Sequence, residues 1–342
     1  MQRAHRTSQS GRRGLTLVEL LLVVTIIGIV AGIGLGMFAS FDPARRAARG
    51  LVANALRQTR NTAIANGAPA RVVVDPATGA VRPEAFVVAG TWRFETEALE
   101  GARGVDGIPN GFPGAYLSDG FVGQALDLDL GPRGAHVAID LSVDPIFQLT
   151  RGVRLGFAVR PESLGDADVV DVGGVVRAKV RRDGSVEFSA VTLRIDDLGR
   201  PVKGETIRVR TPPAVLEPAR WTRVELRYDL RRLVALVEGV PVAERAETRE
   251  LWTITSALKV GGGRQRFEGR VDDLVLSVVT RGEAVVLPKS AVFETVDPIE
   301  VRFDASGGLD PVVHARPVEI PILFDDGERA TVRVRTLGTV ES

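Results

Sequence analysis

The chain of 342 residues contains no cysteine, which excludes disulfide bridges, thiolate metal sites and cysteine nucleophiles. Its three histidines, His5, His136 and His314, lie far apart in the sequence, so a histidine-cluster metal site is not expected. An excess of one charge is also lacking, because 44 Lys and Arg residues face 43 Asp and Glu residues and leave a formal net charge of +1. The chain therefore has no strongly basic body that would hold nucleic acid.

The rest of the composition is that of an ordinary globular protein. Hydrophobic residues make up 44% of the chain and charged residues 25%, which indicates neither disorder nor a fibrous repeat. A chain of this length exceeds one average domain, so we expect two domains.

The first forty residues combine a basic leader with a long apolar segment. Residues 1–14 are polar and basic and contain no acid, and the 22 residues from Leu20 to Phe41 contain no charge. As a helix, that segment would extend about 33 Å at ~1.5 Å per residue, enough to cross a hydrocarbon core. We therefore expect a single transmembrane helix over residues 15–41, in the inner membrane. The leader would stay cytoplasmic, and the head would lie in the periplasm or outside the cell.

Two features separate this segment from a secretory signal peptide or a plain anchor. No small-x-small cleavage site follows the apolar core. In addition, Glu19 lies inside the apolar segment, where a carboxylate costs roughly 2.5–3.5 kcal/mol at a helix centre and less near the end. Such a charge requires a partner of opposite sign.

The segment Gly14–Gly34, GLTLVELLLVVTIIGIVAGIG, closely resembles the type IV prepilin signature. The resemblance implies that a prepilin peptidase cuts between Gly14 and Leu15 and that the new amine of Leu15 is methylated. Leu15 stands where phenylalanine is usual. It also implies that Glu19 of one subunit neutralises the amine of a neighbouring pilin subunit during assembly, so that two charges in lipid are relieved together. Loss of the four leader arginines would take the formal charge from +1 to about −3, which weakens a DNA-binding hypothesis.

The segment 42–67 is expected to form an amphipathic stem helix. Alanine, leucine and valine recur at a spacing of 3.6 residues from Ala44 to Thr59, and arginines take the other face. Asn66-Gly67 is a typical helix end. We expect the arginines to form a solvated face, and lipid phosphates are a second possible partner for those nearest the membrane.

Short strands are expected after the stem and again at the end of the chain. The end of the stem resembles H-type (GspH/FimT-like) minor pseudopilins at Arg60, Ala63, Ile64, Asn66 and Gly67. The C-terminal segments resemble that family's closing strands, with Phe303, Gly307 and Gly338 at the matching places. The resemblance implies a pilin-like β head that is split into residues 68–89 and 283–342.

The segment between the two halves, residues 90–282, is rich in strands that alternate apolar and polar residues, as in Val153–Val159 and Val224–Tyr228. Five fragments resemble, in the right order, a laminin-G-like (concanavalin A-like) jelly roll: TWRFE, GFVGQALDLDLG, GVRLGFAVRP, WTRVELRYD with its partner strand, and FEGRVDDLVLS. We therefore predict an α+β chain in which an all-β sandwich is inserted into a pilin head.

No enzymatic site is expected in the insert. Glu268, Asp272 and Asp273 do not give the paired carboxylates of a retaining glycosidase, which must lie roughly 5–5.5 Å apart. The sequence positions of Trp92 and Trp221 place them in the core rather than on a sugar.

No metal site is certain in the insert, although calcium is possible. Asp127, Asp129, Asp196 and Asp197 could help to hold Ca²⁺, as in many relatives, or could belong to solvated loops.

The function predicted from the resemblances is that of a minor pilin or pseudopilin in a type II secretion or type IV pilus filament. Its insert would bind exported cargo or a partner protein. The alternatives are a pilus-tip adhesin that binds a glycan, a DNA-uptake pilin, which the charge makes less favoured, and a tethered glycosidase, which lacks its carboxylate pair. The sequence leaves the ligand and the filament type open.

Overall fold

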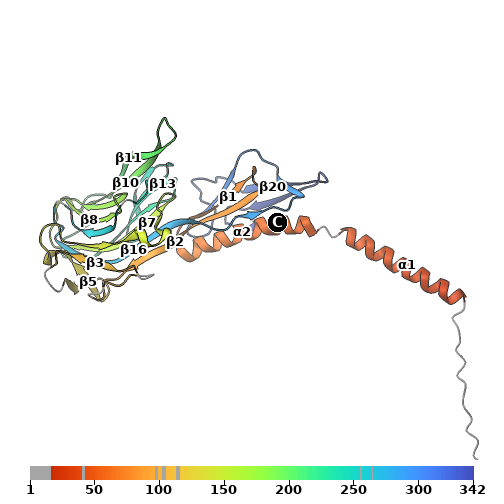
Figure 1. Ribbon diagram of the computed structural model, residues 1–342, viewed down its shortest axis with the longest axis horizontal. Coiled ribbons are helices and arrows are strands. Elements are labelled where there is room, and N and C mark those ends of the chain that lie inside the picture. The colour runs from red at the N-terminus through yellow and green to blue at the C-terminus, as the bar shows by residue number, and fades with distance from the viewer. Residues whose placement is uncertain are drawn as a thin grey trace, which may run out of the picture.

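The computed structural model describes residues 17–40, 43–96, 99–101, 105–112, 116–254, 256–263 and 265–342. Figure 1 shows an elongated body. A small β head packs against α2, and a larger all-β insert lies beyond the head. The helix α1 lies apart from the body, at the N-terminal end of α2.

Two helices lie at the start of the described chain, α1 (Leu17–Ser40) and α2 (Pro43–Asn66). The first lies within the range 15–41, where a transmembrane helix is expected. Counting only the side chains that the structure describes, no helix is long and apolar enough to span a membrane.

The helix α2 is held to the head by its apolar stripe. Ala48, Val52, Leu56 and Ala63 are buried at intervals of four and seven residues, which places them on one helix face. This face packs against β1, β2 and the C-terminal strands. Gly67 ends the helix with a positive φ of 54°, as a C-terminal glycine does.

A small antiparallel sheet closes the head. Its order is β18-β20-β21-β22, and its inward residues, such as Ile320, Val332 and Val334, join the core formed with α2. The strands are β18 (Ala291–Phe293), β20 (Val318–Phe324), β21 (Arg329–Val334) and β22 (Val340–Glu341).

A large sheet runs through both the head and the insert, in the order β14-β13-β12-β7-β16-β2-β1-β19. In addition, β17 pairs with β2, β5 pairs with β16, and β4 pairs with β5. The strands are β1 (Ala70–Asp75), β2 (Ala80–Trp92), β4 (Leu117–Asp119), β5 (Gln124–Asp127), β7 (Val153–Pro161), β12 (Thr222–Tyr228), β13 (Arg232–Val237), β14 (Val240–Ala246), β16 (Gly269–Arg281), β17 (Val285–Val286) and β19 (Ile299–Phe303).

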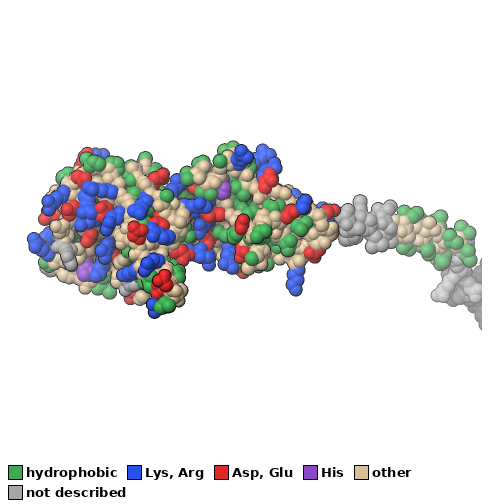
Figure 2. All heavy atoms as spheres, turned by 90° about the horizontal axis from the view of Figure 1, so that it is seen from above, with side chains coloured by type: hydrophobic (Ala, Val, Ile, Leu, Met, Phe, Trp, Pro, Cys, Tyr) green, Lys and Arg blue, Asp and Glu red, His purple; other side chains and the backbone are tan. Residues whose placement is uncertain are grey.

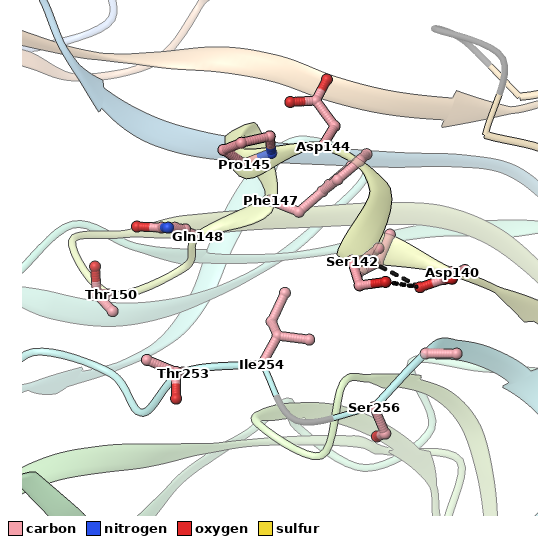
Figure 3. A pocket seen from close by; sticks show the side chains of 12 residues that line it. Asp140, Ser142, Asp144, Pro145, Phe147, Gln148, Thr150, Thr253, Ile254 and Ser256 are labelled. Atoms are coloured by element: carbon pink, nitrogen blue, oxygen red, sulfur yellow. Dashed lines mark hydrogen bonds between the residues drawn. The ribbon is translucent and has the colours of Figure 1, made fainter.

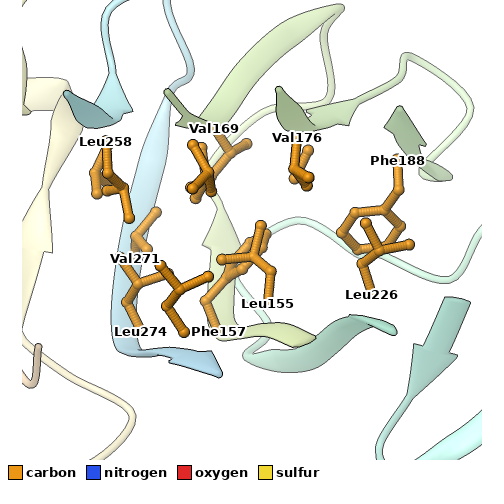
Figure 4. Close-up of a cluster of buried hydrophobic side chains, with 14 of the residues drawn as sticks. Leu155, Phe157, Val169, Val176, Phe188, Leu226, Leu258, Val271 and Leu274 are labelled. Atoms are coloured by element: carbon orange, nitrogen blue, oxygen red, sulfur yellow. The ribbon is translucent and has the colours of Figure 1, made fainter. Parts of the chain in front are cut away.

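A second sheet faces the insert part of the large sheet, in the order β11-β10-β9-β8-β15-β6-β3. Apolar side chains from both sheets, including Phe157, Phe188 and Leu226, are fully buried between them (Figure 4). The insert is therefore an antiparallel sandwich. Its second-sheet strands are β3 (Gly107–Asn110), β6 (His136–Ile139), β8 (Ala167–Val172), β9 (Val176–Val180), β10 (Val186–Ile195), β11 (Pro201–Arg210) and β15 (Leu258–Gly261), with 3-10 turns at Leu128–Leu130, Leu141–Val143 and Pro145–Phe147.

The strands β2 and β16 belong to both parts of the molecule. The first half of β2 pairs with β1 in the head, from Ala80 to Ala85. The second half pairs with β16, which in turn pairs with β7 of the insert. The domain boundary expected between residues 89 and 90 falls inside β2, so the two parts share a continuous ribbon instead of a linker.

The arginine face of α2 is only partly the solvated face expected from the sequence, because Arg46 and Arg57 are exposed but arginines of this face also contact the head. Arg45 forms ion pairs with Asp326 and Glu328 in the head. Arg60 donates a hydrogen bond from Nε to the carbonyl oxygen of Gly307 at 2.9 Å, and Arg57 donates one to the carbonyl oxygen of Val340 at 3.2 Å. These arginines satisfy carbonyl and carboxylate oxygens of the C-terminal strands, so they attach the stem to the head.

Gly338 permits the closest approach at this attachment. It has a positive φ of 79°, and a Cβ atom there would collide with the carbonyl oxygen of Gly307 and approach Nε of Arg60 at 2.8 Å. The positions Arg60, Gly307 and Gly338, which carry the pseudopilin resemblance, therefore meet in space although they lie far apart in the chain.

We expect Gly338→Ala to lower the free energy of unfolding of the full-length protein in detergent by about 3 kcal/mol, because it combines a left-handed backbone with a collision. The matched control is Gly327→Ala, since Gly327 has a similar φ of 83° but no neighbour within 4 Å of the added Cβ. Gly327→Ala should lower the free energy of unfolding by only about 1 kcal/mol in the same urea titration. Equal losses for the two variants would contradict the packing argument.

Candidate functional site

The residues predicted for processing lie at the edge of the described chain. Gly14 and Leu15 lie outside the described residues. Glu19 lies in the first turn of α1, and its side chain is likewise outside what the structure describes.

The head and the insert meet at a buried carboxylate. Glu84 on β2 is 3% exposed and receives three guanidinium groups. Arg71 on β1 approaches it at 2.5 Å, Arg151 of the insert at 2.9 Å, and Arg281 at the end of β16 at 3.1 Å. A buried carboxylate with several charge-assisted hydrogen bonds fixes the groups around it, so Glu84 connects the two parts.

A second ion-pair group lies beside the first. Arg302 on β19 is 2% exposed, forms ion pairs with Asp229 of the insert and Glu300 of the head at 3.1 Å, and donates to the carbonyl oxygen of Asp229 at 2.8 Å. Burial alone would raise the pKa of the Glu300 carboxyl, but Arg71, Arg302 and Arg231 outweigh burial and hold this pKa below its usual value. We call the Glu84 and Arg302 groups together the joint.

His314 completes the joint on the head side. Its Nε2 accepts a hydrogen bond from the backbone N–H of Arg302 at 3.0 Å, so Nε2 carries no proton in this arrangement. Burial lowers the pKa of His314, and the nearby cations Arg231 and Arg302 act in the same direction against Glu300 and Asp310. The neutral ring is therefore part of the folded joint.

The predicted calcium residues Asp127 and Asp129 lie together at the end of β5, and each has an arginine partner. Asp127 accepts the backbone N–H of Asp129 at 3.0 Å and pairs with Nε of Arg270 at 3.2 Å. Asp129 pairs with Arg266 at 3.4 Å. A cation placed between these acids would have to displace the guanidinium groups.

The other two predicted calcium residues lie elsewhere, in the turn between β10 and β11. Asp196 accepts the backbone N–H groups of Leu198 and Arg200 and pairs with the Arg200 side chain at 2.9 Å, while Asp197 is exposed. Figure 1 places this hairpin on the opposite side of the insert from β5. No group of three or more acids or histidines suited to a metal occurs among the described residues. Calcium binding at these acids stays a prediction.

The acids considered for glycoside hydrolysis also have separate partners. Glu268 accepts a hydrogen bond from the Ser163 hydroxyl at 2.6 Å, and Asp273 pairs with Arg223 at 2.8 Å. Asp272 is 1% exposed, and burial raises its pKa while it accepts the backbone N–H groups of residues 121 and 122 at 2.9 and 3.0 Å. These contacts hold the tip of the β4–β5 hairpin in place. That the insert is no enzyme stays a prediction.

The tip of the β4–β5 hairpin, which Asp272 holds in place, exposes apolar side chains to solvent. Phe121 is 41% exposed and Val122 is 62% exposed. Trp221 lies edge-on to Phe121, with the ring centroids 6.1 Å apart and an interplanar angle of 65°. We call Phe121, Val122 and Trp221 the aromatic tip.

Of the tryptophans expected in the core, Trp92 is fully buried and donates to the carbonyl oxygen of Val105 at 2.8 Å. Trp221 is only partly buried, which corrects the expectation for it. It lies just before β12, where a neighbouring turn and not the opposite sheet covers it.

A cleft of about 500 Å³ opens between two segments of the insert (Figure 3). One wall is formed by residues 140–150, which connect β6 to β7, and the other by described residues of the segment before β15. Because the walls lie about a hundred residues apart in the chain, no local sequence pattern predicts this cleft.

Several arginines of the strands are paired with acids. Arg154 and Arg227 both pair with Glu225, at 2.9 and 3.0 Å, and Arg177 pairs with Asp171 at 2.9 Å. Figure 2 shows acidic and basic side chains interspersed over one face of both parts. This distribution does not favour a strand of phosphates as ligand.

We expect Glu84→Gln to lower the free energy of unfolding by about 1–3 kcal/mol, because it removes the charge of a buried carboxylate that three guanidinium groups contact. Glu319→Gln is the matched control, since Glu319 pairs with Arg333 on the surface, where an ion pair contributes about 0–1 kcal/mol. Urea unfolding of both full-length variants would measure the difference. A loss below about 1 kcal/mol for Glu84→Gln would mean that the joint does not bind the two parts together.

We expect stability to fall as the pH drops below about 6.5, because the unfolded chain then protonates a histidine that stays neutral in the folded joint. This contribution is fully present above that pH and is lost as the pH falls toward the lowered pKa. His314→Gln keeps an acceptor without a titrating ring, so its unfolding free energy should depend less on pH between about 7.5 and 5.5. His136→Gln, which removes a ring outside the joint, is measured alongside as the control. Equal slopes for all three proteins would contradict this assignment.

Comparison with known proteins gives one match to a family and distant likenesses to solved structures. None of the curated proteins matches the chain. Domain 4 of AbnA, a GH43 extracellular arabinanase from Geobacillus stearothermophilus in complex with arabinotriose, is 14% identical with a TM-score of 0.41, over 56% of this chain and 93% of that chain. The binding domain of botulinum neurotoxin serotype G is 10% identical with a TM-score of 0.40, over 56% of this chain and 47% of that chain. Residues 9–35 match the family described as the prokaryotic N-terminal methylation motif, which confirms the predicted type IV pilin-like N-terminus.

Proposed function

We propose that this chain is a minor pilin or pseudopilin subunit of a type IV pilus or a type II secretion filament, and that its insert binds exported cargo or a partner protein. The observation that carries the proposal is the methylation motif at residues 9–35, with Gly14 and Glu19 in register inside it. A prepilin peptidase would remove residues 1–14, and methylation would follow at Leu15. The N-terminal segment would anchor the subunit in the inner membrane before assembly.

Assembly of this subunit would be driven in part by electrostatics. Processing creates a cation at Leu15, and the carboxylate of Glu19 lies one helical turn further on. In an apolar environment both charges are costly until each meets an opposite charge on a neighbouring subunit. Docking would relieve both charges together, which makes a carboxylate at position 19 a condition for entry into a filament.

The GspH/FimT-like subtype and a minor role are supported by the head. The Arg60, Gly307 and Gly338 contact uses the residues that carry the resemblance, and the inserted sandwich adds about 190 residues to one side of the head. Such a volume would crowd a filament in which every subunit carried it. We therefore infer a minor subunit placed near the tip.

The surface that supports protein binding is the aromatic tip. Phe121 and Val122 are exposed, Asp272 holds their backbone, and Asp272 lies near the start of β16, at the opposite end of that strand from Arg281 of the joint. Exposed aromatic side chains on a preorganised turn are typical contacts of a protein interface. The rigid joint would hold this tip away from the filament axis.

A second candidate function is glycan binding by a pilus-tip adhesin, which the cleft in Figure 3 favours. Calcium at Asp127, Asp129, Asp196 and Asp197 is proposed only as an accessory to that function. DNA uptake is not favoured, because the strand arginines are paired with acids.

Processing can be tested in a host that carries the filament machinery. We expect the intact mass of the membrane-extracted protein to lack residues 1–14, and Gly14→Arg to retain them. Gly11→Arg is the control, because it adds the same charge to the leader without altering the expected cut. A mature protein that began at any residue other than Leu15 would overturn the proposed processing.

Assembly is tested separately with Glu19→Gln. This variant should be processed normally, but its amount in sheared filaments should fall on the order of 10-fold or more, because an unpaired amine remains in an apolar environment. Normal incorporation of Glu19→Gln would contradict the assembly role of the carboxylate.

A further inference from the structure

We propose that the cleft between residues 140–150 and the segment before β15 binds an uncharged carbohydrate. The proposal rests on the proposed function only in placing the insert outside the inner membrane, because the binding itself is a property of the cleft. It also differs from the calcium-assisted site expected at Asp127 and Asp196, since neither of these residues lines the cleft.

The cleft has the size and the stable frame of a ligand site. Its volume of about 500 Å³ lies within the ordinary range of small-molecule sites. The wall formed by residues 140–150 is the upper one in Figure 3, and the segment before β15 is the lower one. In the upper wall, Asp140 accepts the backbone N–H of Ser142 at 2.9 Å and Asp144 accepts that of Ile146 at 2.9 Å, so each carboxylate caps a 3-10 turn. The carbonyl oxygen of Thr150 accepts the backbone N–H of Leu251 at 2.9 Å and joins the two walls at one end. These contacts therefore hold the described residues of the upper wall in place before a ligand arrives.

The polar groups of the walls suit hydroxyl groups, which donate and accept hydrogen bonds at once. Hydroxyls come from Ser142, Thr150, Thr253 and Ser256, and Gln148 adds an amide with both donors and an acceptor. Asp140 uses Oδ1 for the Ser142 backbone and hydroxyl, which leaves Oδ2 to accept from a ligand.

An apolar strip lies between these polar groups. The side chain of Ile254 points from the lower wall into the cleft, toward the segment that carries Phe147 (Figure 3). Pro145 is exposed and extends the apolar surface on the upper wall, while Leu141 and Phe147 support that wall from the core behind it. Sugar rings present C–H faces beside their hydroxyls, so a lining of alternating apolar and polar groups matches them better than it matches a wholly polar ion.

The charge of the cleft selects among carbohydrates. Two aspartates line it, and no Lys, Arg or His is among its described lining residues. A sialylated, sulfated or phosphorylated ligand would therefore meet like charge without a counter-ion, which disfavours binding. An uncharged oligosaccharide meets acceptors for its hydroxyl hydrogens without that repulsion.

The test uses full-length protein in detergent micelles and an array of uncharged oligosaccharides with their sialylated and sulfated counterparts, with calcium and with a chelator. We expect binding to uncharged members only, unaffected by the chelator. Asp140→Asn should weaken it about 10-fold, because asparagine still caps the turn but loses the charged acceptor. Gln148→Ala, on an exposed segment, should weaken it similarly.

The matched control is Asp144→Asn, because Asp144 caps the neighbouring turn but its carboxylate points away from the opposite wall in Figure 3. It removes the same charge and should leave binding within about 2-fold. Phe121→Ala, at the aromatic tip, should also leave glycan binding unchanged, so loss of a protein partner and loss of the sugar can be told apart.

Three results would overturn the proposal: binding to no uncharged member, binding only of sialylated or sulfated members, and loss of binding on chelation. Equal losses in Asp140→Asn and Asp144→Asn would likewise remove the cleft as the site. The processing and filament assays do not depend on any of these results, so failure of the sugar site leaves the filament proposal standing, and the reverse also holds.

Discussion

The buried carboxylate of Glu84 is the interaction on which the arrangement of the molecule depends. Three guanidinium groups reach it from the head, from the β7 side of the insert and from the end of β16. Removing a carboxylate from water is costly, and the guanidinium groups offset that cost. Arg71 supplies partners from the head, and Arg151 and Arg281 add partners from the insert and from the end of β16, so the group joins both parts. The main effect of this contact is therefore to fix the orientation of the insert relative to the head, even though removing the Glu84 charge alone would destabilise the fold.

The shared strands explain why so large an insertion is compatible with a small head. Because β2 enters the insert and β16 leaves it as antiparallel neighbours, the two connections lie side by side, and Arg281 returns opposite Glu84. The sandwich thus extends an existing sheet and needs no separate linker. A load applied to the insert would be carried along paired strands and by the ion pairs of the joint, so the connection between head and insert is stiff.

The parts of the structure that depend on local pattern could be predicted from the sequence. The apolar stripe of α2 follows from its 3.6-residue spacing, and strands such as β12 follow from alternation. The partners of isolated charges could not be predicted. Arg60 has the same chemistry whether it faces water or a carbonyl oxygen, and Asp127 gives no local sign that Arg270, 143 residues later, will neutralise it. The joint, the aromatic tip and the cleft all arise from such distant pairings, and so no local motif contains them.

The cleft and the aromatic tip lie at different distances from the joint, and each position suits the role proposed for it. Thr150, on the wall of the cleft, directly precedes Arg151, which reaches Glu84 at 2.9 Å. One end of the cleft thus lies next to the joint. The aromatic tip lies further away, because Asp272, which holds it, is near the start of β16, whereas Arg281 of the joint is at the other end of that strand. A bound ligand that transmits force is best held close to the joint, because the force then reaches the head through few strands and through the contact of Arg151 with Glu84. A surface that recognises another protein is best placed at the far end, where the filament does not obstruct it.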